Sequence, residues 1–105
     1  MRTGEIARWT TPSIHYKPSK ADLPEIEEIE LTLKQMGQTV IRAGKEDAQI
    51  LSDGFLWNFT QEETGMLTNG VAMTVQIDYK TTNGQRYTTR PQDYIVSDSA
   101  VNGVI

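Results

Sequence analysis

The sequence predicts an all-β fold, a single antiparallel β-sandwich of about seven strands with one short helical turn near residues 60–67. Thr, Ile and Val number 13, 9 and 6 among 105 residues, and β-branched side chains pack well on a pleated sheet. Apolar and polar residues alternate in several short runs, which is the period of a half-buried strand. Turn dipeptides separate these runs at spacings too short for β-α-β units, so a sandwich or barrel is favoured.

The first predicted strand covers residues 13–17. Pro12 and Pro18 bracket this run. Because proline has no N–H to donate to a neighbouring strand, we expect the run to lie at the edge of a sheet.

Residues 28–36 fit two patterns. Apolar side chains recur here at helical spacing, after a helix-start signal at residues 22–25. However, Ile29, Leu31 and Leu33 also alternate with polar residues. A helix would turn Leu31 about 200° away from Ile29 and expose it, whereas a strand buries all three side chains. We therefore predict a strand, preceded by a turn that has room for one helical turn.

Glycine-containing pairs predict tight hairpins at three places. Gly37 separates the strand just described from residues 39–43. Asp53-Gly54 lies between two apolar runs at 48–52 and 55–59, and both residues of this pair tolerate positive φ. Asn83-Gly84 predicts a further hairpin before the last part of the chain.

Residues 71–80 carry the clearest strand pattern in the sequence. Apolar side chains occupy every second position, namely Val71, Met73, Val75, Ile77 and Tyr79. This alternation predicts one face on a core and one face in water.

Two further signals complete the predicted fold. Residues 60–63 form a capping box, which starts a helix that Gly65 limits to one or two turns. Pro91 divides the last segment into either one bent strand or two strands. With six to eight short strands, an immunoglobulin-like sandwich is favoured. We expect residues 1–105 to form one domain, with candidate flexible arms at 1–10 and 100–105.

Composition excludes several classes of function. Ten Lys and Arg against 14 Asp and Glu give a net charge of −4, which disfavours binding to nucleic acid. The chain has no cysteine and one histidine, so disulfides and thiolate or multi-histidine metal sites are excluded. No apolar run approaches a membrane span, and no secretory signal is visible at the start. We therefore expect a soluble protein that is made inside the cell, with no membrane partner.

The polar residues do not predict catalysis. Four glutamates between residues 25 and 30 could in principle hold a hard cation, but a solvated strand face explains them better. His15 lacks a recognisable nucleophile or orienting acid nearby in the sequence, so a surface position is expected. Asn58 begins a glycosylation pattern that is common by chance. We expect no enzyme activity, no metal and no cofactor.

Candidate interface residues lie at both ends of the chain. Arg8 and Trp9 precede the first predicted strand, outside any periodic pattern. Such a tryptophan can anchor an interface, stack on a sugar or fold back over one end of the sandwich. Val101, Val104 and Ile105 form an apolar tip at the other end.

The order of these motifs resembles small structural proteins of the tail modules of siphophages and prophages of gram-positive bacteria. The segments that carry this resemblance span most of the chain and are residues 10–12, 35–39, 60–64, 76–84 and 102–105. The resemblance implies an immunoglobulin-like protein of the tail or upper baseplate that acts through protein–protein contacts. Its implied partners are other phage structural proteins and further copies of itself, in a virion if the prophage is functional. The alternative is a carbohydrate-binding or adhesion module.

Overall fold

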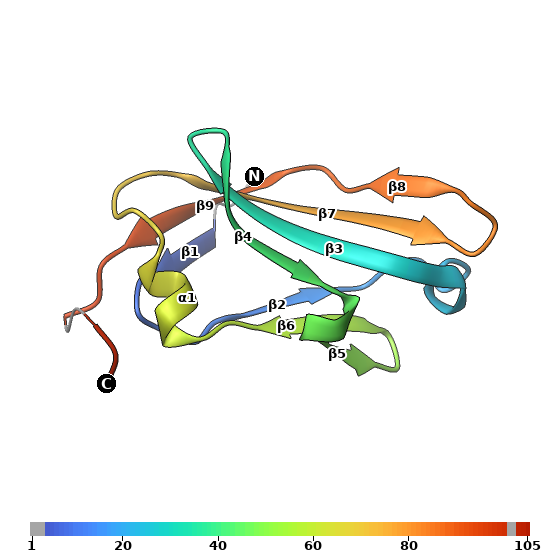
Figure 1. Ribbon diagram of the computed structural model, residues 1–105, viewed down its shortest axis with the longest axis horizontal. Helices are drawn as coiled ribbons and strands as arrows, with labels where there is room; N and C mark the ends of the chain where they lie inside the picture. Colours follow the sequence, from blue (N-terminus) through green and yellow to red (C-terminus); the bar gives the residue numbers. More distant parts are fainter. Residues whose placement is uncertain (1–3, 101–102) are drawn as a thin grey trace.

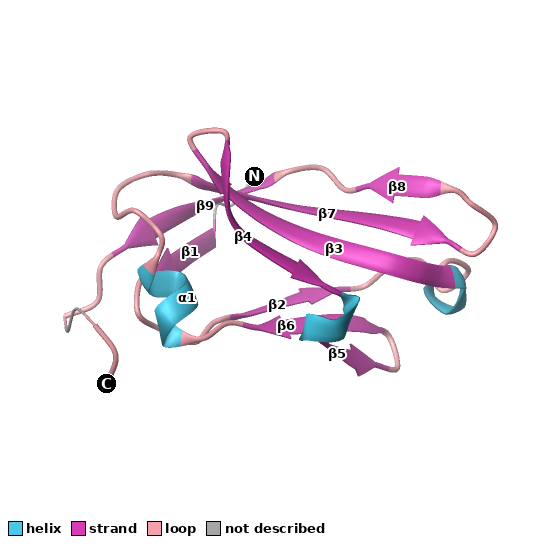
Figure 2. Ribbon diagram, in the orientation of Figure 1, coloured by secondary structure: helices cyan, strands magenta, loops and turns pink. Residues whose placement is uncertain are grey.

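A computed structural model of the chain describes residues 4–100 and 103–105, which build an all-β sandwich of two sheets (Figure 1). The described residues form nine strands rather than about seven. The strands are β1 (Gly4–Ala7), β2 (Ser13–Tyr16), β3 (Ile26–Gln35), β4 (Gln38–Gly44), β5 (Ala48–Leu51), β6 (Gly54–Asn58), β7 (Met73–Thr81), β8 (Arg86–Thr88) and β9 (Gln92–Ser97). One α-helix, α1 (Gln61–Gly65), and the 3-10 turns η1 (Leu23–Glu25) and η2 (Lys45–Asp47) lie in the connections (Figure 2).

The strand order is that of an immunoglobulin-like sandwich. The larger sheet has the order β1-β9-β7-β3-β4, with β8 also paired to β7, and the smaller sheet has the order β2-β6-β5. If β2 to β7 are lettered B, C, C′, D, E and F, and β9 is G, the sheets become G-F-C-C′ and B-E-D. This is the immunoglobulin connectivity. We predicted a purely antiparallel sandwich, and this is wrong at one place, because β1 pairs in parallel with β9.

The core lies between the inner faces of the two sheets. The alternation predicted for residues 71–80 is confirmed, since Met73, Val75, Ile77 and Tyr79 are all buried, whereas Val71 lies before β7. The remaining core residues come from every layer and are Ile6, Ile26, Ile29, Leu31, Leu33, Ile41, Ala43, Phe55, Trp57, Phe59, Leu67 and Val96. Strand β3 therefore buries its predicted apolar face, and the helical interpretation of that segment is wrong.

Two of the predicted hairpins have the expected glycine geometry. Met36 and Gly37 link β3 to β4 with φ values of 53° and 75°, which is the type I′ pattern that matches the twist of paired strands. Gly84, between β7 and β8, has a φ of 87°.

The β5–β6 hairpin forms as predicted, but the reason given for its glycine is wrong. Gly54 is the first residue of β6 and does not have positive φ. A Cβ at Gly54 would lie 2.0 Å from the carbonyl oxygen of Tyr16, on the neighbouring strand β2. Glycine is needed here because another backbone approaches closely, not because the turn demands an unusual conformation.

The last part of the chain forms two strands, β8 and β9, which both pair with β7. Strand β8 pairs with residues 78–80 of β7, and β9 pairs with residues 73–75 of the same strand. Thr89 keeps contact between them, because its N–H donates to Ile77 O at 2.9 Å. Pro91 lies in this break, where it removes no ladder hydrogen bond.

A buried glutamine, Gln35 at the end of β3, holds the connection between α1 and β7. Its side-chain nitrogen donates to Thr68 O and Val71 O, both at 3.0 Å, and its oxygen accepts from Thr68 N at 2.8 Å. The side chain is 6 % exposed. Gln35 therefore satisfies backbone groups that no strand neighbour can reach.

Replacing Gln35 with leucine is expected to lower the free energy of unfolding by about 3 kcal/mol, because buried backbone groups lose their partners. Urea unfolding measures this loss, and amide exchange at Thr68 should accelerate. Gln38→Leu is the matched control, since Gln38 is the exposed cross-strand partner of Gln35 and should change stability by less than about 0.5 kcal/mol. Equal effects of the two substitutions would contradict this role.

Candidate interaction surfaces

The segment after β1 turns sharply and seats Trp9 against helix α1. Trp9 has a φ of 64°, a left-handed conformation that is unusual for a bulky side chain. Its ring lies where a side chain on Gly65 would be, because a Cβ at Gly65 would approach Trp9 Cζ3 to 2.4 Å. Trp9 is half-buried and covers this end of the sandwich.

Arg8 fastens the same turn to two other segments. Its Nη1 is 2.7 Å from Asp98 Oδ1, and its Nη2 donates to Gly65 O at 3.0 Å. The guanidinium carbon is 5.7 Å from the Trp9 ring centroid, within cation–π range. Arg8 and Trp9, which the sequence placed among the candidate interface residues, are therefore adjacent and built into the end of the domain.

Three exposed apolar side chains lie after α1 or near its first residue. Met66, directly after α1, is 57 % exposed, and Val104 and Ile105 are 54 % and 89 % exposed. The backbone N–H of Ile105 donates to Gln61 Oε1 at 2.8 Å, so the C-terminus lies against α1 (Figure 1).

We call Arg8, Trp9, Met66, Val104 and Ile105 together the α1 end. Val101, the fifth candidate from the sequence, lies outside the described residues. Sequence reasoning missed Met66. The available signal was an apolar residue just past a helix that Gly65 limits to one turn.

The proposed N-terminal arm is in part a strand. Residues 4–7 of the predicted arm form β1, and Ile6 is 5 % exposed within the core. Residues 1–3 lie outside the described part of the chain. The sequence showed no alternation long enough to reveal a four-residue strand.

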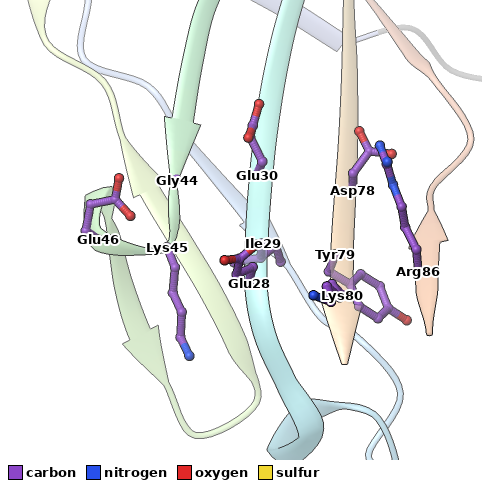
Figure 3. Close-up of a pocket in the computed structure, with 10 residues that line it drawn as sticks. All are labelled: Glu28, Ile29, Glu30, Gly44, Lys45, Glu46, Asp78, Tyr79, Lys80 and Arg86. Atoms are coloured by element: carbon purple, nitrogen blue, oxygen red, sulfur yellow. The ribbon is translucent and has the colours of Figure 1, made fainter. Parts of the chain in front are cut away.

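A depression of about 490 Å³ lies on the outer face of the larger sheet and η2 (Figure 3). Its charged lining is mixed, with four carboxylates and three cations: Glu28, Glu30, Glu46, Asp78, Lys45, Lys80 and Arg86. Acidic Glu30 lies opposite Asp78, and basic Lys80 opposite Arg86. The depression therefore carries nearly equal numbers of acidic and basic side chains.

The acidic segment around residue 28 is a solvated sheet face. Glu30 binds Arg42 at 2.6 Å, and Glu25 accepts a hydrogen bond from the Thr82 hydroxyl at 2.7 Å. Among the residues that the structure describes, no group of three or more His, Asp or Glu side chains could hold a metal ion.

His15 lies on the edge strand β2, beside a small cavity of about 180 Å³. Its Nε2 is 3.3 Å from Asp53 Oδ1, and Lys17 Nζ is 3.5 Å from Asp53 Oδ2. Desolvation alone would raise the pKa of Asp53, but the neighbouring His15 and Lys17 outweigh it and lower the pKa below its ordinary value. The fold therefore gives His15 an acidic partner that its sequence neighbourhood does not show, at an exposed position on β2.

Three tyrosine rings pack together at the end of the sandwich away from α1, where Tyr87 stacks on Tyr79 and Tyr16 is tilted against it. The ring centroids of Tyr16 and Tyr79 are 6.1 Å apart, and those of Tyr79 and Tyr87 are 5.2 Å apart. The buried Tyr79 hydroxyl donates to Asp22 Oδ2 at 2.9 Å. Burial, together with this hydrogen bond to Asp22, raises the pKa of Tyr79 well above its ordinary value. Burial also raises the pKa of Tyr16.

Stability is therefore expected to fall at alkaline pH. The unfolded chain releases the tyrosine protons near pH 10, whereas folded Tyr79 and Tyr16 hold theirs to higher pH. This contribution is complete below about pH 10 and is lost as pH rises towards the folded pKa values. Urea unfolding between pH 8 and 11.5 should show the loss. Tyr79→Phe should make the curve shallower, and an unchanged slope would contradict the assignment.

Comparison of the chain with protein-family models, curated proteins and solved structures finds no match. No helix in the described part of the chain is long and apolar enough to cross a membrane.

Proposed function

We propose that the chain is a non-enzymatic structural protein that acts through protein–protein contacts in a phage or prophage tail or baseplate. The observation that carries the proposal is the α1 end, where Met66, Val104 and Ile105 are more than half exposed beside Arg8 and Trp9. Aromatic residues, Met and Arg are the side chains enriched in protein interfaces. Exposed apolar groups gathered on one side of a domain mark contact sites.

The phage context comes from the resemblance of the sequence motifs. In this proposal the protein is made in the bacterial cytoplasm and enters the virion. Its partners are other structural proteins of the particle and further copies of itself, and it needs no cofactor.

The alternative, a carbohydrate-binding or adhesion module, requires aromatic rings exposed on one face. Trp9 is instead half-buried against Gly65, and Tyr79 is buried between Tyr16 and Tyr87, so that among these four rings Tyr87 alone is exposed, at 42 %. This packing favours the contact protein. Titration with polysaccharides separates the two, because saturable binding abolished by Trp9→Ala would support the alternative.

The first test is composition of the particle itself. A DNA-damaging agent is used to induce the prophage in the source strain, and the purified particles are analysed by mass spectrometry. We expect the chain at a stoichiometry fixed relative to the other tail proteins. Its absence from particles that contain those proteins would overturn the proposal.

The second test uses variants of the α1 end in a strain that lacks the native copy. Met66→Glu and Ile105→Glu place charges on exposed apolar positions, so incorporation into particles should fall while the purified variants stay folded. Ile50→Glu is the matched control, because Ile50 is 65 % exposed on β5, outside the α1 end. Normal incorporation of both α1-end variants would contradict the proposed surface.

A further inference from the structure

Strand β1 is a short strand at the edge of the larger sheet. It has four residues, and β9 is its neighbour in the sheet. Its parallel pairing runs from Gly4 opposite Tyr94 to Ala7 opposite Ser97. Residues 8–12 then lead into β2, which belongs to the other sheet. Five residues thus join β1 to β2. The backbone hydrogen bonds of β1 are made with β9, near the other end of the chain.

The five-residue connection contains the strained residue Trp9. A left-handed backbone is unfavourable for any side chain with a Cβ, and glycine would be free of this penalty. In the part of the chain that the structure describes, Trp9 Nε1 is also buried without a hydrogen-bond partner. In the closed arrangement, β1 pairs with β9 of the same chain. This arrangement therefore carries a conformational free-energy penalty that arises in the connection and not in the strand.

The site that receives β1 does not depend on the connection. Strand β9 is held independently by β7, with Met73 opposite Tyr94. The core position filled by Ile6 and the carboxylate of Asp98 that binds Arg8 also belong to the body of the domain. An opened chain would expose a sheet edge and an apolar hole, which an identical β1 from another copy fits in the same register.

We propose that β1 exchanges between two copies of the chain, so that β1 of each copy pairs with β9 of the other. The ladder, the burial of Ile6 and the Arg8–Asp98 ion pair are the same in closed and exchanged forms. What differs is residues 9–12 of the connection, which can extend between the two copies. This extension releases the left-handed conformation of Trp9 and gives up the hydrogen bonds of Thr10 with Ala7 and Thr64. Short connections under strain favour this kind of exchange. The inference names a second copy as one partner within the proposed function.

The chain has no cysteine, so single-cysteine variants can report the exchange directly. Glu5 and Ile95 are exposed register partners on β1 and β9. A Glu5→Cys chain and a mass-tagged Ile95→Cys chain are unfolded together, refolded together at high concentration and oxidised gently. We expect a disulfide-linked dimer of one chain of each kind as the main crosslinked product. The matched control pairs Glu5→Cys with Thr39→Cys, an exposed position on β4 at the opposite edge of the sheet.

The connection should set the extent of exchange. Trp9→Ala keeps the left-handed penalty, whereas Trp9→Gly removes it, and both lose the indole. The dissociation constant of the exchanged dimer should therefore be at least about tenfold lower with alanine than with glycine. Gly65→Ala, which displaces the Trp9 ring from its seat, should also increase the mixed dimer.

Three results would overturn the proposal. One is a mixed dimer no more abundant than in the Thr39→Cys control, which indicates non-specific association. Another is a chain that stays monomeric with β1 closed. The third is a monomer with β1 open, which points to a strand from a different protein as occupant. These measurements use the purified chain alone, so they fail or succeed separately from its incorporation into particles.

Discussion

Trp57→Ala is expected to lower the free energy of unfolding by about 3–5 kcal/mol, as truncation of large buried aromatic side chains generally does. Trp57 is 1 % exposed on β6, and its ring stacks on Phe55 at a centroid distance of 6.1 Å. Its Nε1 donates to Gly44 O at 3.0 Å. The substitution therefore leaves both a cavity and a carbonyl without its donor.

The loss is large against the total stability of a domain of this size, which is about 5–15 kcal/mol. Urea unfolding followed by circular dichroism measures it. Trp57→Phe is the control that keeps most of the ring volume and removes the donor to Gly44. We expect Trp57→Phe to lose less than half of the unfolding free energy that Trp57→Ala loses. Equal losses for the two variants would show that the hydrogen bond to Gly44, and not the ring volume, dominates.

Gly54→Ala is expected to destabilise the domain by about 3 kcal/mol or more, at the upper end of the range for overpacking. The added Cβ would lie 2.0 Å from Tyr16 O and 3.2 Å from Lys17 Cα. These are backbone atoms, so no side-chain rotation can relieve the contact. The pairing of Tyr16 with Phe55 must open, which detaches part of the edge strand β2.

Gly70→Ala is the matched control for this effect. Gly70 has a φ of 78°, and a Cβ there meets nothing within 4 Å. The expected loss is about 1 kcal/mol from backbone conformation alone. Thermal unfolding of both variants separates the two causes, and a smaller loss for Gly54→Ala than for Gly70→Ala would contradict the close-approach explanation.

Local sequence patterns predicted much of the fold. The alternation in residues 71–80 needed no tertiary information, because a strand with one buried face must alternate. The capping box at Thr60 is also local, and its two hydrogen bonds form as predicted, with Thr60 Oγ1 accepting from Glu63 N and Glu63 Oε1 accepting from Thr60 N. Gly37 and Gly84 mark turns for the same reason, since positive φ is a property of the residue itself.

The candidate site depended more on tertiary structure. The sequence placed Arg8 and Trp9 in an unpatterned segment, and Val104 and Ile105 near the C-terminus, without indicating that both would lie around α1. The link between them is the hydrogen bond from Ile105 N to Gln61 and the packing of Trp9 on Gly65. These contacts join residues that are 44 to 57 positions apart in the sequence. Contacts at such separations produce no periodic pattern, so the sequence could not predict them.

The sequence by itself determined the all-β class, most of the strands and the turns at Gly37 and Gly84, because these follow from side-chain alternation and backbone preferences of neighbouring residues. Only the tertiary structure decided that β1 runs parallel to β9, that Gly54 makes room for the Tyr16 carbonyl and that Gln35 secures the connection before β7. Each of these depends on which segments meet in space. That choice is made by burial of the whole core, which is a property of the assembled sheets and not of any single run of residues.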